Sequence, residues 1–232
     1  MSKSKTPHVI RPLVLIIWSL LPSIAIYVGM YVVKSAVWSF VFYHCFCLVP
    51  AIIWGRQFWR PTFVAPKPLH IAILVVVAII FTAIAVLVYE LMGPMLLSDQ
   101  GAINLLKEQD YSREIFWPIS LYAIVVNPFF EELFWRGVVF NALDRAVLPK
   151  HFAIMCSSFG YALFHYWIFR LVLYPGWAEF GTILLAIYGA ILALIYRKTG
   201  SILTTAIAHG LLTDTACIAL IIDLSRKYPG AM

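Results

Sequence analysis

The chain has 232 residues, of which 62% are apolar and 12% are charged, and its formal net charge is +6. Soluble globular domains carry about 25% charged residues, so this composition excludes a soluble domain, a disordered chain and a disulfide-based scaffold. Its apolar residues can supply at most about seven transmembrane helices of about 20 residues each.

Seven apolar segments follow one another along the chain, and we expect them to form an all-α, polytopic helical bundle in a membrane. They are Leu13–Val33, Ser35–Trp54, Leu69–Met92, Ile115–Leu143, Phe152–Phe169, Phe180–Tyr196 and Ser201–Ile222. The first two are predicted to form a tight helical hairpin around Lys34. The basic N-terminus before the first segment predicts an uncleaved signal anchor.

The stretches between these segments predict little further structure. Residues 55–68 contain three prolines, which cannot continue a helix, so we expect a basic connector at the membrane surface. The polar stretch 94–114 is expected to contain a short surface helix. The four cysteines lie within apolar stretches and are interpreted as buried structural thiols. We predict a single integral membrane domain over residues 1–232.

The basic residues predict the orientation. With the N-terminus inside, the inner loops receive Lys3, Lys5, Arg11, Arg56, Arg60, Lys67, Arg145, Lys150, Arg197 and Lys198, and the outer loops receive Lys34, Lys107, Arg113, Arg170, Arg226 and Lys227. This excess favours a cytoplasmic N-terminus and an outside C-terminus, in the plasma membrane if the host is bacterial. Because orientation accounts for the basic charge, we expect no nucleic-acid partner.

Three of the predicted spans contain ionisable side chains, which cost about 2.5 kcal/mol or more each at the bilayer centre. The fourth segment contains Glu131, Glu132 and Arg136, the fifth His165, and the seventh His209. A rise of about 1.5 Å per residue places Glu131 about 18 Å and His209 about 12 Å from the inner ends of their helices, so the two can meet. Each of these residues alone has a structural interpretation, but several costly groups at similar depth favour a functional site.

Helical spacing separates the two glutamates. Glu132 and Arg136 are four residues apart and can form an ion pair on one helix face. Glu131 is rotated by about 100° and shares Arg136 less easily. A general base must take up a proton near neutral pH, which a carboxylate without a close cation does more readily. Glu131 is therefore the candidate base and Glu132 the structural partner.

The same residues carry a resemblance to a known family. The segment EELFWR at 131–136 matches an EExxxR motif, YALFH at 161–165 is similar to an FxxxH motif, and HGLLT at 209–213 is similar to a third motif, in which Asn or Asp follows His four residues later. In this order, on three spans, the motifs resemble those of the CPBP intramembrane proteases, the CAAX prenyl protease and bacteriocin-processing (Abi) family. The resemblance covers residues 115–220, the expected catalytic core.

The resemblance implies an endopeptidase whose polar cavity opens toward the cytosol and which cuts a peptide bond near the inner membrane face. It implies that Glu131, with His165 as its partner, activates a water, and that His209 stabilises the oxyanion. Glu132 and Arg136 would support these groups. The partners would be the bilayer and a peptide or protein substrate; no residue indicates whether that substrate is prenylated.

Two motif positions depart from the family pattern. Tyr161 stands where the family has Phe, and its hydroxyl needs a partner. Thr213 stands where Asn or Asp is expected, and a threonine within a helix often donates to its own i−4 carbonyl. Asp214 is not expected to replace it, because it lies about 140° around an α-helix from His209, against about 40° for Thr213.

The resemblance favours a glutamate-activated water without a cofactor, and zinc is the alternative. Glu131, His165 and His209 could supply two nitrogens and one oxygen to a zinc ion, although the chain contains no HExxH motif. Two other functions stay open. A catalytically degenerate family member could act as an immunity or scaffold protein, with Thr213 as its main support. A proton-coupled transporter would also use buried Glu and His, but we find no internal repeat.

Overall fold

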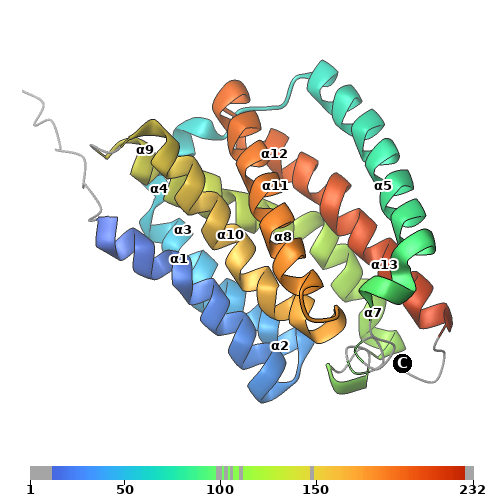
Figure 1. Ribbon diagram of the computed structural model, residues 1–232. Helices are drawn as coiled ribbons and strands as arrows, with labels where there is room; N and C mark the ends of the chain where they lie inside the picture. Colours follow the sequence, from blue (N-terminus) through green and yellow to red (C-terminus); the bar gives the residue numbers. More distant parts are fainter. Residues whose placement is uncertain are drawn as a thin grey trace, which may run out of the picture.

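The computed structural model describes residues 12–97, 101, 104, 107–109, 112–146 and 149–227. Helices make up nearly all of this part of the chain, and six of them are long and apolar enough to cross a membrane. Within the described ranges, the only β contact is an isolated bridge between Leu97 and Leu173. The predicted all-α membrane bundle is confirmed, and Figure 1 shows its helices packed around one another.

The first two spans form the predicted hairpin. In chain order its elements are α1 (Pro12–Tyr27), η1 (Val28–Val33), α2 (Ala36–Val41), η2 (Phe42–Leu48) and α3 (Val49–Trp54), the two η elements being π-helical. Lys34 turns the chain with a left-handed backbone, φ 56°. Ser35 then begins α2 by accepting a hydrogen bond from the N–H of Trp38 at 3.5 Å.

The connector after this hairpin is more helical than predicted. Two short elements, α4 (Arg56–Trp59) and η3 (Arg60–Thr62), come before the irregular residues 63–67. Pro61 is compatible with η3 because it lies in the first turn, where its missing N–H is not needed. Trp59 donates from Nε1 to the carbonyl of Ile52 at 2.9 Å, so the connector is held against the second span.

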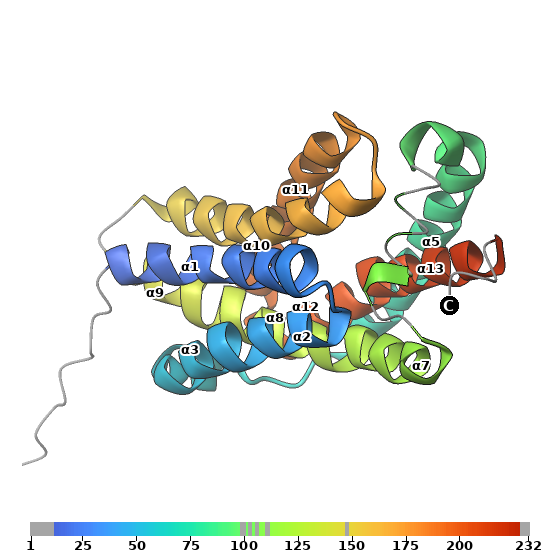
Figure 2. The ribbon, with the colours of Figure 1, turned by 90° about the horizontal axis from the view of Figure 1, so that it is seen from below.

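The third span, α5 (Pro68–Leu96), is the least buried. Its mean hydropathy is 3.4, and only 11% of its most apolar stretch is buried within the protein. Leu74 and Ala78 pack in a small cluster on the last span, and Lys227 donates to the hydroxyl of Tyr89 at 3.1 Å. Figure 2 shows α5 next to α13 and away from α1 and α10. Its other faces are apolar, as expected for a surface that contacts lipid.

The predicted fourth span is one continuous helical stretch at the centre of the bundle, but it is not among the six long apolar helices. Its elements are α7 (Arg113–Leu121), η4 (Tyr122–Val126), α8 (Asn127–Glu132), η5 (Leu133–Phe140) and α9 (Asn141–Asp144). Every residue of the π-helical η5 is buried, including Arg136. The charged groups of the site, which this stretch carries, set it apart from the six apolar spans.

The last spans surround this central stretch. The elements are α10 (Lys150–Val172), α11 (Trp177–Thr199), α12 (Ile202–His209), the π-helical η6 (Gly210–Asp214) and α13 (Thr215–Lys227). Gly200 ends α11 with φ 65°, a backbone conformation that favours glycine. Ser201 then caps α12 by accepting from the N–H of Thr204 at 3.1 Å. This sharp turn directs α12 back into the bundle beside α8 (Figure 1).

Two smaller predictions have mixed outcomes. Within 94–114, residues 94–96 belong to α5 and positions 101, 104, 107 and 108 are helical, but much of the predicted surface helix lies outside the described residues, as do residues 1–11 of the predicted signal anchor. The prediction of buried thiols holds only for Cys47, since Cys45 and Cys217 are exposed and Cys156 is half-buried.

Candidate active site

Glu131 lies at the centre of the bundle with only 1% of its surface exposed. Its Oε1 accepts a hydrogen bond from Nδ2 of Asn127 at 2.9 Å, one helical turn earlier in α8. Its Oε2 lies 3.8 Å from Nε2 of His209 and makes no hydrogen bond. The predicted meeting of Glu131 and His209 is confirmed. Asn127 was not predicted, although its position four residues before the glutamate places it on the same helix face.

Glu132 holds together three helices. Its Oε1 accepts from Arg136 at 2.7 Å and from Nδ1 of His209 at 3.0 Å, and the other guanidinium nitrogen of Arg136 donates to the carbonyl of Gly189 at 2.8 Å. All of these side chains are fully buried. A buried charge is tolerated only when it is paired and hydrogen-bonded, so this network fixes α12 and α11 against the central helix. The geometry agrees with a supporting role for Glu132.

The extra hydroxyl of Tyr161 has found its partner in His209. It lies 3.0 Å from Nε2 of the imidazole, and the guanidinium of Arg136 lies over the tyrosine ring at 5.1 Å from its centroid. Because Nδ1 of His209 donates to Glu132, the ring is held from both sides. The replacement of Phe by Tyr at this position therefore adds a second clamp on the histidine.

His165 lies in the same cavity as Glu131 but contacts different groups. Its Nδ1 is 2.8 Å from the carbonyl of Tyr161. A carbonyl only accepts hydrogen bonds, so Nδ1 carries the proton and Nε2 is the acceptor of the neutral ring. The ring packs on Phe164 at a centroid distance of 4.0 Å. His165 is thus positioned to accept a proton within the cavity.

The third motif differs from its prediction. Thr213 donates to the carbonyl of His209 at 3.0 Å and so uses its hydroxyl on its own helix. Asp214, in contrast, places Oδ1 at 3.6 Å from Nε2 of His209 and lines the cavity. The expectation that Asp214 would point elsewhere was wrong, because it assumed α-helical geometry over residues that form a π-helix.

The π-helical turn explains this placement. In η6 the N–H of Thr215 bonds the carbonyl of Gly210, five residues earlier, and the Thr215 hydroxyl donates to the same carbonyl at 2.8 Å. An i→i+5 turn aligns residues five apart instead of four. It therefore brings Asp214 onto the face of His209. Gly210 allows the turn to lie against η4 and α8, because an added methyl would collide with the carbonyl of Ile124 and lie 3.2 Å from Pro128.

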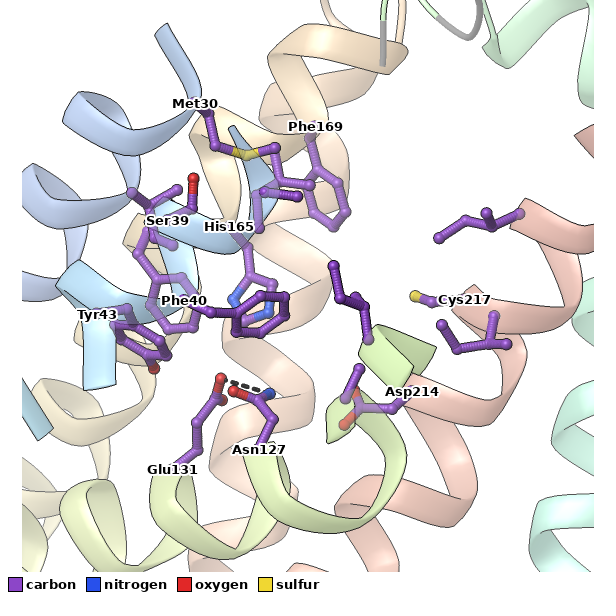
Figure 3. A pocket seen from close by; sticks show the side chains of 18 residues that line it. Met30, Ser39, Phe40, Tyr43, Asn127, Glu131, His165, Phe169, Asp214 and Cys217 are labelled. Atoms are coloured by element: carbon purple, nitrogen blue, oxygen red, sulfur yellow. Dashed lines mark hydrogen bonds between the residues drawn. The ribbon is translucent and has the colours of Figure 1, made fainter. Parts of the chain in front are cut away.

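Of these side chains, Asn127, Glu131, His165 and Asp214 line a cavity of about 200 Å³, and His209 lies behind Glu131 and Asp214. Figure 3 shows Asn127 and Glu131 at its floor, Ser39, Phe40 and Tyr43 from the α2–η2 segment on one wall, and Asp214 and Cys217 on the opposite wall. Apart from His165, the rest of the lining is apolar, with Met30, Ile119, Phe169 and Ile221 among its residues. The cavity thus lies in the half of the bundle that contains the Lys34 hairpin, the beginning of α7 and the ends of α10 and α13.

The zinc alternative does not fit the side chains as they are placed. Among the described residues, no group of three or more His, Cys, Asp and Glu side chains is arranged to hold a metal ion. His209 uses Nδ1 for Glu132 and Nε2 for the Tyr161 hydroxyl, so neither ring nitrogen is available as a ligand in this arrangement.

The comparison with known families agrees with the geometry. Residues 113–213 match the family described as type II CAAX prenyl endopeptidase Rce1-like. The match includes all three motifs, so the resemblance to the CAAX protease family is confirmed for this segment. The family indicates a protease, which implies a peptide or protein substrate, and the six long apolar helices indicate a multi-pass membrane protein. No curated protein and no solved structure matches the chain.

Proposed function

We propose that the chain is an intramembrane endopeptidase that uses Glu131 as the general base for water attack on a peptide bond. The observation that carries this proposal is the unpaired Oε2 of Glu131, buried in a cavity beside His209. An oxygen without a partner can accept a proton from a water bound in the cavity, whereas Oε1 is held by Asn127. The hydrogen bond from Asn127 keeps the carboxylate of Glu131 in one orientation.

The proposed reaction follows from these positions. Glu131 takes a proton from the water, whose oxygen attacks the carbonyl carbon while the π electrons move to the carbonyl oxygen. With a proton on each ring nitrogen, His209 donates from Nε2 to the resulting oxyanion, which replaces the Tyr161 hydroxyl as the partner of that nitrogen. Oδ1 of Asp214 lies 3.6 Å from Nε2 and favours this charged form of the ring. When the C–N bond breaks, the proton passes from Glu131 to the leaving amine. His165, with Nε2 as an acceptor, can exchange a proton with Glu131 or the water within the same cavity.

Two features bear on the substrate and on the alternatives. The largely apolar lining suits an apolar group next to the scissile bond, as in a prenylated CAAX peptide.

The main support for a degenerate family member is Thr213, and Asp214 supplies an acidic side chain beside His209 in its place. No contact within the described part of the chain specifically favours a transporter over a protease.

The orientation of the chain in the membrane determines the side on which we expect the peptide bond to be cut. The cavity lies toward the Lys34 hairpin, which the distribution of basic residues places outside. A cytoplasmic N-terminus and cleavage near the inner face therefore exclude each other. A cytoplasmic N-terminus places the cavity nearer the outer side of the membrane, whereas cleavage near the inner face requires the opposite orientation.

The proposal is tested by reconstituting the full chain in liposomes with a panel of peptides. The panel contains a farnesylated CAAX peptide, the same peptide without the lipid, and leader peptides with apolar residues at the cut. We expect cleavage by the wild type with a preference for the farnesylated peptide, no cleavage by Glu131→Gln, and full activity in the presence of a chelator. Failure of the wild type to cut the whole panel contradicts the proposal, and loss of activity with the chelator supports zinc.

A further inference from the structure

Tyr43 forms part of the cavity wall although it lies far from the Rce1-like segment in sequence. It belongs to η2, and only 1% of its surface is exposed. Its ring packs against Phe164 at a centroid distance of 4.8 Å and against His44 at 5.1 Å, so the side chain is held firmly. In Figure 3 its hydroxyl is directed toward the floor of the cavity, where Glu131 lies.

The hydroxyl of Tyr43 has no hydrogen-bond partner. A buried polar group without a partner costs about 1–3 kcal/mol, so such a group calls for an explanation, and a bound water or substrate oxygen is one. The carboxylate of Glu131 and the indole of Trp135 lie close enough to act on this hydroxyl, but neither forms a hydrogen bond of good geometry with it. Oε2 of Glu131 and Nε1 of Trp135 also lack partners. Three unpaired polar atoms are therefore grouped at the one place where the proposed reaction needs a water and a carbonyl oxygen.

The other donors that line the cavity are already used. The hydroxyl of Ser39 donates to the carbonyl of Ser35 at 2.7 Å, Asn127 donates to Glu131 at 2.9 Å, and Nδ1 of His165 bonds the carbonyl of Tyr161 at 2.8 Å. Among the described residues that line the cavity, Tyr43 carries a hydroxyl that donates no hydrogen bond, and the acceptor nearest to it is the carboxylate of Glu131. An oxygen bound beside Glu131 would supply an acceptor for this hydroxyl.

We propose that Tyr43 is a further catalytic residue, whose hydroxyl donates to the carbonyl oxygen of the scissile peptide bond and stabilises the oxyanion. The inference rests on the proposed function. During water attack the carbonyl π electrons move to this oxygen, which accepts the hydrogen bond while Tyr43 keeps its proton. The rigid packing of the ring means that the donor is in place before the charge develops, as effective oxyanion donors require. Thr213, whose hydroxyl is used on its own helix, cannot serve this purpose.

The test compares Tyr43→Phe with the wild type on the peptide that the wild type cleaves. The substitution removes one oxygen that makes no hydrogen bond, so the melting temperature should not fall. We expect kcat to fall about 100-fold or more, as for the loss of one oxyanion donor, with little change in KM. Tyr122→Phe is the matched control, because this ring contacts His44 and Phe40 outside the cavity floor, and it should keep wild-type kcat.

A second variant guards against an effect of the substitution on folding. Replacement of Tyr43 by 4-aminophenylalanine keeps the ring and a donor, and it should retain much more activity than Tyr43→Phe. Wild-type kcat in a folded Tyr43→Phe protein overturns the role of Tyr43, as does an equal loss in both position 43 variants. If Glu131→Gln is inactive in the same assay, either result leaves the protease function standing; an active Glu131→Gln contradicts that function itself.

Discussion

Oδ1 of Asp214 lies 3.6 Å from Nε2 of His209, although the two residues are five positions apart in one helix. In an α-helix this separation would place them on different faces, about 140° apart. The π-helical turn from Gly210 to Asp214 removes that difference. The residue after the motif position, rather than Thr213 itself, therefore faces His209.

This geometry predicts different outcomes for two neighbouring substitutions. Asp214→Ala should lower kcat about 100-fold, because His209 loses a group that positions its Nε2. Thr213→Val should keep kcat within about threefold, since its hydroxyl donates mainly to the carbonyl of His209 at 3.0 Å and has only a long contact of 3.4 Å with Oδ1 of Asp214. Steady-state kinetics on the peptide cut by the wild type measure both. A larger loss in Thr213→Val than in Asp214→Ala would show that the motif position acts as in an ordinary α-helix.

The contrast between these two residues also shows what could be predicted from the sequence. The motifs, the spacing of Glu132 and Arg136, and the depth of Glu131 and His209 follow from regular helical geometry, and the structure agrees with them. Asp214 could not be placed, because local hydrophobic periodicity does not distinguish an α-helical turn from a π-helical one.

Two further features depend on tertiary contacts that the sequence does not display. The cavity wall formed by Tyr43 requires knowledge of which face of the second span meets the central helix. The hydropathy of the central stretch predicts an apolar span. In the structure a buried ion pair and hydrogen bonds hold this stretch inside the bundle. Composition predicts that a helix is in the membrane, and packing decides which neighbours it has.

The buried pair of Glu132 and Arg136 should behave differently from a surface pair. Arg136→Met leaves a buried carboxylate without its cation and should lower the free energy of unfolding by about 3–5 kcal/mol. The double variant Glu132→Gln/Arg136→Met should lose less than Arg136→Met alone. The exposed pair Lys227–Asp223 is the control, for which Lys227→Met should cost less than about 1 kcal/mol.

Unfolding in mixed detergent micelles measures these free energies. If the double variant is less stable than Arg136→Met by the full cost of Glu132→Gln, the two side chains are energetically independent, and the network does not hold the helices as described.

Gly210 should be required for the contact between the last span and the central helix. Gly210→Ala places a methyl against the carbonyl of Ile124, which belongs to a helix and cannot move without cost. We expect a loss of about 1–3 kcal/mol in stability together with lower kcat, because the turn that positions Asp214 is displaced. Gly93→Ala is the control, since its methyl would meet only the ring of Tyr89, at 3.3 Å. Equal melting temperatures for both variants would contradict this explanation.

The orientation can be measured with single cysteines. Lys34 and Lys198 lie at opposite ends of the bundle and are exposed. In a background in which Cys45, Cys47, Cys156 and Cys217 are replaced, a membrane-impermeant maleimide should label Lys34→Cys in intact cells and Lys198→Cys only after permeabilisation. The reverse pattern would place the cavity on the cytosolic side, as the family resemblance implies.

The central claim is that the carboxylate of Glu131 is the base that activates water. Glu131→Gln tests it most directly, because glutamine keeps the shape of the side chain and can still accept the hydrogen bond from Asn127, so the fold should be unchanged. Cleavage of the wild-type peptide substrate should fall by at least about 100-fold at an unchanged melting temperature. Cleavage by a folded Glu131→Gln protein at the wild-type rate would contradict the account.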